Sequence, residues 1–185
     1  MSIAAIVLAA GASRRLGSPK QLVMLGGETL LERAVRVAGW AGCSPVIVVL
    51  GAEAEIVLRG LPEGAVPVRN DQWKEGMGAS IRAGVRACEA VAAGVVVMTC
   101  DQPAVTAEHL QSLMAGPEVK ASRYAGRNGV PAFFPKKYFE QLMALKGETG
   151  ARDLLRSAEA LELKDGELDV DTAEDLQRAR DLFEW

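Results

Sequence analysis

The feature of the sequence that most restricts its fold is a series of short, almost uninterrupted apolar segments, each followed by a segment with helical periodicity. The apolar segments are residues 3–9, 46–50, 66–69 and 95–98. Runs of this kind, without polar interruption, are typical of parallel strands that are buried on both faces of a sheet. We therefore expect the four segments to lie side by side in one sheet.

The intervening segments predict helices that cover this sheet. Residues 29–40 and 80–92 carry apolar side chains every three or four positions. Residues 122–125 and 131–134 predict a hairpin around the turn at 126–129. Further helices are expected at residues 137–145, 150–157 and 172–183, and Thr172 with Asp175 resembles the start of a capping box. The alternation predicts an α/β protein, a doubly wound three-layer α/β/α sandwich with a mostly parallel sheet, and we assign residues 1–185 to a single domain.

Charge, cysteine content and hydropathy narrow the functional classes. The formal net charge is -3, from 21 basic and 24 acidic residues without a run of five like charges, so we expect no nucleic-acid partner. The three cysteines lack zinc-finger spacing and are too few for a disulfide framework. No apolar segment reaches the roughly 18 residues that span a bilayer, and no basic region precedes the first one. The sequence therefore predicts a cytoplasmic protein with no membrane partner.

The turn after the first apolar segment is the first candidate site. It reads Leu-Ala-Ala-Gly-Ala-Ser-Arg-Arg-Leu-Gly-Ser-Pro-Lys at residues 8–20. In open α/β sheets ligands bind beyond the carboxyl ends of the strands, and small residues let the backbone approach a ligand closely. Arg15 and Lys20 supply positive charge for phosphates, whereas the spacings of a P-loop and of a dinucleotide fingerprint are absent. The turn predicts an anion site, the alternative being a plain connection between a strand and a helix.

Carboxylates follow a second strand at the same edge. Asp101 comes three residues after the end of the segment at 95–98, where a carboxylate suits Mg²⁺ bound together with substrate phosphates. Asp169 and Asp171 form a second pair near the C-terminus, although aspartate before a helix is also a common cap. The sequence therefore predicts a magnesium site at Asp101, against the alternative of a turn or cap aspartate.

Catalysis by an activated serine is disfavoured. His109 is the single histidine, and we expect it on a solvated helix surface away from the crevice. Without a second histidine, Ser13 has no obvious activating base, which argues against a Ser-His-Asp hydrolase.

Six motifs stand in the order found in MobA-like nucleotidyltransferases. They are residues 8–20, 70–84, 100–103, 129–134, 147–152 and 169–175. The chain resembles this family over nearly its whole length, and most of all its molybdenum cofactor cytidylyltransferase branch. The resemblance implies a Rossmann-like nucleotidyltransferase fold of the nucleotide-diphospho-sugar transferase type. It also implies Mg²⁺-dependent transfer of CMP from CTP to molybdopterin or molybdenum cofactor, with release of pyrophosphate.

The same resemblance implies roles for individual residues. It assigns catalysis to Arg15, Lys20 and Asp101, and the metal ion to Asp101 and Asp171. The implied nucleotide contacts are Leu8, Ala9, Ala10, Gly11, Arg15, Lys20, Asn70 and Ser80. The implied acceptor contacts are Trp73, Gly76, Met77, Gly150 and Arg152. A target molybdoenzyme or its chaperone is implied as a further partner.

The choice of base depends on two short motifs. The guanylyltransferase branch typically has Leu-Ala-Gly-Gly where this chain has Leu-Ala-Ala-Gly, and Asp101-Gln102-Pro103 resembles the cytidylyl branch, so CTP is expected over GTP. Glu148 stands where the family more often has Asp, which leaves its role open. Three alternatives remain: another nucleoside triphosphate such as GTP as donor, a sugar or polyol phosphate as acceptor, and a carrier or chaperone of molybdenum cofactor without catalysis.

Overall fold

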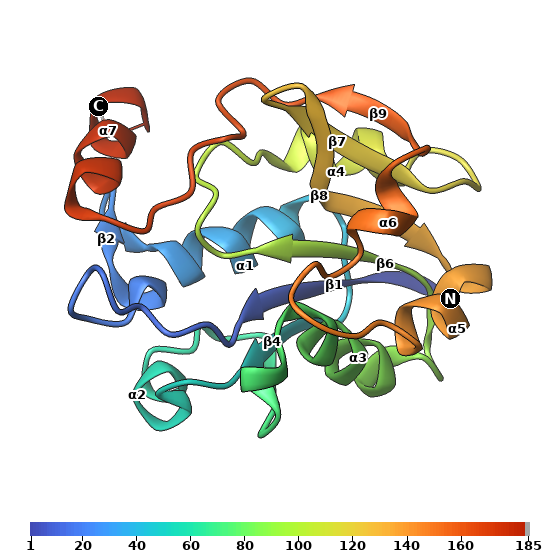
Figure 1. Cartoon of the computed structure of the whole chain (residues 1–185), viewed down its shortest axis with the longest axis horizontal. Helices are drawn as coiled ribbons and strands as arrows, with labels where there is room; N and C mark the ends of the chain where they lie inside the picture. The colour runs from blue at the N-terminus through green and yellow to red at the C-terminus, as the bar shows by residue number, and fades with distance from the viewer. Residues whose placement is uncertain (184–185) are drawn as a thin grey trace.

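Seven strands form one twisted sheet in the computed structural model, which describes residues 1–183 (Figure 1). The order across the sheet is β5-β4-β1-β6-β8-β7-β9. The bounds are Ser2–Ala9 (β1), Val46–Leu50 (β4), Ala65–Arg69 (β5), Ala92–Thr99 (β6), Lys120–Tyr124 (β7), Arg127–Pro135 (β8) and Glu159–Glu162 (β9). All neighbouring pairs are parallel except those that involve β8. The expected mostly parallel sheet is confirmed, and so is the β7–β8 hairpin.

Helices cover both faces of this sheet. One face packs against α1 (Leu30–Trp40), α2 (Ala54–Arg59) and α4 (Ala107–Met114), the other against α3 (Met77–Cys88), α5 (Phe139–Met143) and α6 (Arg152–Leu155). The side chains of β1 alternate between the two layers, with Ala5 and Val7 toward α1 and with Ala4 and Ile6 toward α3. This arrangement confirms the predicted three-layer α/β/α sandwich.

The last helix, α7 (Ala173–Phe183), packs beside the small β2–β3 hairpin (Met24–Leu25 and Glu28–Thr29). The predicted capping box at its start is confirmed. The Thr172 hydroxyl accepts a hydrogen bond from Asp175 N at 3.1 Å, and the Asp175 carboxylate accepts one from Thr172 N at 2.9 Å. Because this cap fixes where α7 begins, it also fixes the path of the preceding segment, which carries Asp169 and Asp171.

Three short 3-10 helices complete the secondary structure of residues 1–183, at Lys20–Leu22, Trp73–Glu75 and Lys136–Tyr138. The first two contribute side chains to a cavity at the carboxyl edge of the sheet. Within residues 1–183, no helix has both the length and the apolar character needed to cross a membrane.

The structure corrects several expectations about individual elements. The segment at 66–69 is not fully buried: it belongs to β5, an edge strand that pairs only with β4, and Val66 is 44% exposed. An edge position also accommodates Pro67, which has no N–H to donate. The helix expected at 80–92 begins three residues earlier and ends at Cys88, and Ala92 already belongs to β6. The helix expected at 150–157 is a single turn, α6.

His109 lies in α4, as expected, but its side chain is half-buried and not solvated. Its Nε2 lies 2.8 Å from the hydroxyl of Ser122 in β7, and burial lowers the pKa of the imidazole. The Ser122 hydroxyl in turn donates to the backbone carbonyl of Pro131 in β8. The solvated-surface interpretation is therefore wrong, because α4 packs against the sheet at this position.

Candidate active site

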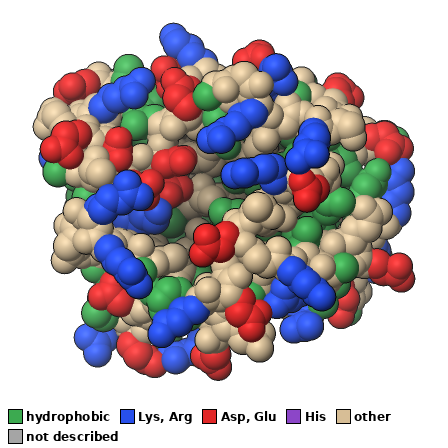
Figure 2. All heavy atoms as spheres, in the orientation of Figure 1, with side chains coloured by type: hydrophobic (Ala, Val, Ile, Leu, Met, Phe, Trp, Pro, Cys, Tyr) green, Lys and Arg blue, Asp and Glu red, His purple; other side chains and the backbone are tan. Residues whose placement is uncertain are grey.

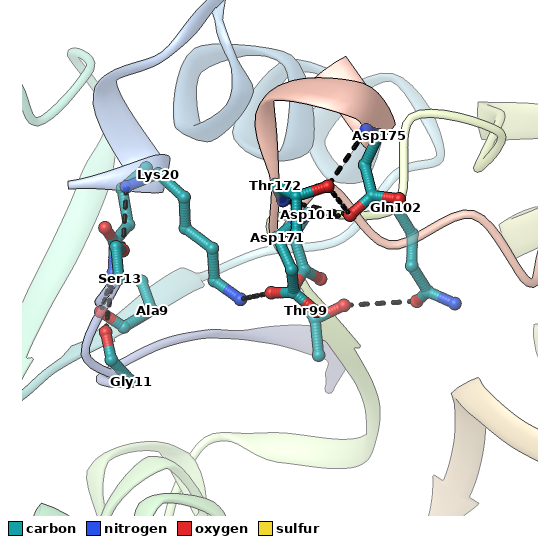
Figure 3. Close-up of polar contacts among 11 residues, drawn as sticks. Ala9, Gly11, Ser13, Lys20, Thr99, Asp101, Gln102, Asp171, Thr172 and Asp175 are labelled. Carbon is teal, nitrogen blue, oxygen red and sulfur yellow. Dashed lines mark hydrogen bonds and ion pairs between the residues drawn. The ribbon is translucent and has the colours of Figure 1, made fainter. Parts of the chain in front are cut away.

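The turn that follows β1 is held from within by its own side chains. Gln21, which is buried, donates a hydrogen bond from Nε2 to the carbonyl of Ala9 at 2.8 Å. The backbone N–H of Lys20 donates to the hydroxyl of Ser13 at 2.8 Å (Figure 3). Both hydrogen bonds join the end of the turn to its beginning, so they fix the backbone position of Lys20 relative to the end of β1.

The Lys20 side chain reaches across the sheet edge to two carboxylates. Its Nζ lies 2.6 Å from Oδ2 of Asp101 and 2.9 Å from Oδ1 of Asp171 (Figure 3). The side chains of Lys20 and Asp101 are only 18% and 11% exposed, so water screens their attraction little. Burial opposes the charged ammonium group, but the two carboxylates outweigh it and raise the pKa of Lys20 above its ordinary value. Three residues that the sequence predicted for one site thus contact one another.

These residues meet because of the strand order. β1 and β6 are parallel neighbours, and Figure 1 shows their carboxyl ends on the side of the molecule that carries α7. The segment before α7 is fastened to the end of β6 by a hydrogen bond from the backbone N–H of Val170 to the carbonyl of Asp101, at 2.9 Å. The strand order therefore brings the turn and Asp101 together, and the backbone hydrogen bond from Val170 to Asp101 adds Asp171 to them.

Asp169 is a third carboxyl group at this edge. Burial raises its pKa to about 7, and the charges of Asp101 and Asp171 add to the effect. Asp169 lines a cavity together with Asp101, whereas Asp171 lines none of the cavities described below. The sequence identified Asp169 only as part of a pair, because its place in a cavity lined by the β7–β8 hairpin depends on the fold.

The carboxylates fit a hard divalent cation. Oxygens of Asp101 and Asp171 both lie within 2.9 Å of a single cationic nitrogen, and carboxylate oxygens are the ligands that Mg²⁺ and Mn²⁺ prefer. Within residues 1–183, no group of three or more His, Cys, Asp or Glu side chains is arranged to hold a metal ion. A cation at this position would therefore take its remaining ligands from a substrate or from water.

Two cavities adjoin at this edge of the sheet, and Figure 2 shows a hollow on this face ringed by charged side chains. The first, which we call the turn cavity, has a volume of about 640 Å³. Its lining includes six of the predicted nucleotide contacts: Leu8, Ala9, Ala10, Gly11, Lys20 and Ser80. Its other charged or aromatic lining residues are Arg14, Trp73, Lys74, Asp101 and Glu148.

The second, which we call the hairpin cavity, has a volume of about 570 Å³ and lies against the β7–β8 hairpin. Its lining includes four arginines: Arg123, Arg127, Arg152 and Arg156. The two cavities share four lining residues: Met77, Thr99, Asp101 and Glu148. Asp101 and Glu148 therefore lie on the wall between the cavities.

Some of the predicted contacts lie outside both cavities. Arg15 is exposed and its charge acts on the carboxylate of Asp175, whereas its neighbour Arg14 lines the turn cavity. Asn70 is buried behind the cavity wall, where its Nδ2 donates to the Ser80 hydroxyl at 3.0 Å. The sequence offered no signal that distinguishes Arg14 from Arg15, since neighbouring residues of an irregular turn follow no periodicity.

The predicted acceptor contacts are divided between the cavities. Trp73 and Gly76 line the turn cavity, Met77 lines both, and Arg152 lines the hairpin cavity. Gly150 lies behind Met77 with a φ of 57°, and a β-carbon there would come within 2.8 Å of the Met77 sulfur. The functional roles of these residues remain predictions.

Gln102 braces the hairpin cavity. Its Nε2 donates to the carbonyls of Val130 and Gly166, at 3.2 and 3.1 Å, and its Oε1 accepts from the Thr99 hydroxyl at 3.1 Å. Gln102 is buried and does not line the turn cavity. The side chain therefore joins the end of β6 to β8 and to the segment that leads to Asp169.

A mostly parallel sheet whose carboxyl edge joins a small-residue turn, a lysine and carboxylates at two adjoining cavities has the arrangement of an α/β nucleotidyltransferase. Residues 5–163 match the MobA-like NTP transferase domain, and the chain belongs to this family of nucleotidyltransferases.

Comparison with individual proteins agrees with this assignment. The chain is 36% identical over 194 residues to the purine catabolism protein PucB of Bacillus subtilis, covering 95% of this chain and 94% of PucB. It is 40% identical over 111 residues to a probable molybdenum cofactor guanylyltransferase of Opitutus terrae, covering 57% of this chain and 51% of that protein. The protein is thus related to molybdenum cofactor nucleotidyltransferases.

Solved structures show the same fold. Rv0371c from Mycobacterium tuberculosis H37Rv superimposes with a TM-score of 0.84 at 32% identity, covering 98% of each chain. A nucleotidyl transferase from Methanothermobacter gives 0.82 at 26% identity, covering 98% of this chain and 97% of that one. A structure of Rv0371c in complex with manganese gives 0.78 at 29% identity, covering 98% and 99%. The expected Rossmann-like nucleotidyltransferase fold is confirmed.

Proposed function

We propose that the protein transfers CMP from CTP to the terminal phosphate of molybdopterin or of molybdenum cofactor, with release of pyrophosphate. The observation that carries the proposal is the position of Asp101 on the wall between the two cavities. A donor in the turn cavity and an acceptor in the hairpin cavity would meet at this wall. Nucleotidyl transfer requires such a meeting beside groups that neutralise phosphate charge.

The turn cavity suits the donor. The small side chains from Ala9 to Gly11 leave room for a nucleotide against the backbone, and Lys20 and Arg14 offer positive charge to a triphosphate. The choice of CTP rests on the resemblance of this turn to the cytidylyl branch. The relative named as a guanylyltransferase makes GTP the second donor to test.

The hairpin cavity suits an anionic acceptor. Arg123 and Arg156 already have polar partners in Asn128 and Asp153. Among residues 1–183, the side chains of Arg127 and Arg152 form no hydrogen bond or salt bridge, although the charge of Arg127 acts on Asp169. Both guanidinium groups are therefore available to a phosphate in the cavity. A phosphorylated acceptor accounts for this concentration of arginine better than a neutral one.

The chemistry requires alignment and charge neutralisation. An oxygen of the acceptor phosphate forms a bond to the α-phosphorus of CTP while the bond from that phosphorus to pyrophosphate breaks. Because the attacking oxygen is already anionic, the reaction needs no strong general base. Asp101 and Asp171 would hold Mg²⁺, which when bound neutralises charge on the phosphates, and Lys20 would contribute a second positive charge. A target molybdoenzyme or its chaperone would receive the product.

Pyrophosphate release tests the proposal. The protein is incubated with Mg²⁺ and molybdenum cofactor, and separately with CTP, GTP, ATP and UTP, each with an acceptor-free control. We expect release with CTP that depends on the acceptor. Preference for GTP would correct the donor, and release with a sugar phosphate in place of molybdenum cofactor would correct the acceptor. No release with any pair, despite measured nucleotide binding, would favour a carrier without catalysis.

A further inference from the structure

The ammonium group of Lys20 lies between the two carboxylates that would hold the divalent cation. Both contacts, 2.6 Å to Asp101 and 2.9 Å to Asp171, are in or near the range of charge-assisted hydrogen bonds. The lysine and Asp101 are mostly shielded from water, so the arrangement is an ion triad with strong mutual attraction. In this conformation the lysine itself is the cation of the site.

A metal ion would need the same space. Mg²⁺ binds carboxylate oxygens at roughly 2.1 Å and tolerates little distortion of its octahedral geometry. An ion bound to the oxygens of both Asp101 and Asp171 that face Lys20 would take the position of the ammonium group. We propose that Lys20 competes with the divalent cation for Asp101 and Asp171, so that the protein binds metal weakly until a nucleoside triphosphate draws Lys20 onto its phosphates.

The charges support this exchange. Two carboxylates carry two negative charges, and Lys20 neutralises one of them, which weakens the attraction for a further cation. A triphosphate in the turn cavity carries more negative charge than the carboxylate pair, and Lys20 lines that cavity. Once Lys20 turns toward the phosphates, both carboxylates and the phosphate oxygens become available to the metal.

The geometry of the lysine permits such a movement. Its backbone is held by the hydrogen bond to Ser13, so the position of its α-carbon stays fixed. Its four-carbon side chain has rotatable bonds that can redirect the ammonium group from the carboxylates to the cavity. The inference depends on the proposed function for the identity of the anionic ligand, and it goes further by making metal binding dependent on nucleotide binding.

The test is the affinity of the metal-free full chain for Mn²⁺, measured by electron paramagnetic resonance without nucleotide. We expect Lys20→Met to bind Mn²⁺ at least about tenfold more tightly than the wild type, because the competing charge is removed. Lys74→Met is the matched control: Lys74 lines the same cavity, and within residues 1–183 its ammonium group contacts the Trp73 ring and no carboxylate. We expect the control to change Mn²⁺ affinity by less than about twofold.

Equal Mn²⁺ affinity in the wild type and in Lys20→Met, or an equal gain in Lys74→Met, would overturn the competition. If Lys20→Met unfolds, Lys20→Gln is used in the same comparison, since it removes the charge but can still donate hydrogen bonds to the carboxylates. Binding of a non-hydrolysable α,β-methylene analogue of CTP with Mn²⁺ is measured in parallel. Analogue binding by the wild type without a Mn²⁺ gain in the variant would refute the competition alone. A Mn²⁺ gain without analogue binding would support the competition and count against CTP.

Discussion

Gln102 provides the sharpest test of how the hairpin cavity is built. Its side chain donates hydrogen bonds to the carbonyls of Val130 and Gly166, and so ties β6 to two segments from later in the chain. Gln102→Met keeps a side chain of similar length and flexibility but removes the donor to both carbonyls, together with the oxygen that accepts from the partly exposed Thr99 hydroxyl. The substitution therefore separates the hydrogen bonds from the packing.

The substitution costs the two carbonyls different shares of their hydrogen bonding. Val130 O keeps a second donor, the hydroxyl of Tyr124 at 2.8 Å, so only part of its hydrogen bonding is lost. Gly166 O loses the donor at 3.1 Å, and an unsatisfied buried acceptor costs about 1 to 3 kcal/mol. With roughly 1 kcal/mol for the bond to Val130, we expect a loss of about 2 to 4 kcal/mol of unfolding free energy. For a chain of this size that lowers the melting temperature by roughly 4 to 16 °C.

Chemical denaturation of the variant and of a matched control measures this loss. Gln111→Met changes an exposed glutamine on α4 and should alter the unfolding free energy by less than about 0.5 kcal/mol. In the pyrophosphate assay the Gln102 variant should raise KM for the acceptor several-fold and leave KM for CTP nearly unchanged. The reason is that Gln102 lines the hairpin cavity but not the turn cavity. A loss no greater than that of the control, or a larger effect on CTP than on the acceptor, would refute this account of Gln102.

Three further changes test other parts of the site. Lys20→Ala should lower turnover in the pyrophosphate assay by roughly 10² to 10³, and unchanged turnover would remove Lys20 from catalysis. The folded-state pKa of Asp169, about 7, exceeds its ordinary value of 3.8, so its contribution to stability is present below about pH 4 and is lost as the pH rises through 7. Asp169→Asn should abolish that loss, about 1 kcal/mol after allowance for solvent screening, in melts of the metal-free protein at pH 5 and 8. Gly84→Ala should destabilise by about 1 to 3 kcal/mol, since its β-carbon would meet the Ile6 side chain at 2.5 Å, whereas Gly39→Ala in open space should not.

The meeting of Lys20 and Asp101 was predictable from strand order, whereas Asp171, which follows no strand, was expected there only from the family resemblance. Residues that leave parallel strands at their carboxyl ends reach the same edge, whatever their separation in sequence. The burial of β5 was mispredicted for a related reason: an apolar segment shows that a strand exists but not whether a neighbour covers its outer side. Val66 is exposed because no strand among residues 1–183 pairs beyond β5.

The details of the site depend on contacts that no local pattern contains. Arg14 and Arg15 are chemically equivalent in the sequence, and only the path of the turn directs Arg14 to the cavity. Asp169 and Asp171 are two residues apart in a segment without regular secondary structure, yet one lines the hairpin cavity and the other binds Lys20. Their difference depends on which element each side chain meets: the hairpin for Asp169 and Lys20 of the turn for Asp171.

The separation of the two cavities also changes what can determine the choice of base. The triplet Asp101-Gln102-Pro103 was interpreted as a mark of CTP use, but Gln102 lines the hairpin cavity and is occupied with three partners of its own chain. A donor in the turn cavity would contact the segment from Leu8 to Gly11 instead, where Ala10 replaces the glycine of the guanylyl branch. Selectivity for the base would then lie in the turn and selectivity for the acceptor in the hairpin, with Asp101 common to both. Two substrates of different chemistry can therefore be recognised independently and still meet at one carboxylate.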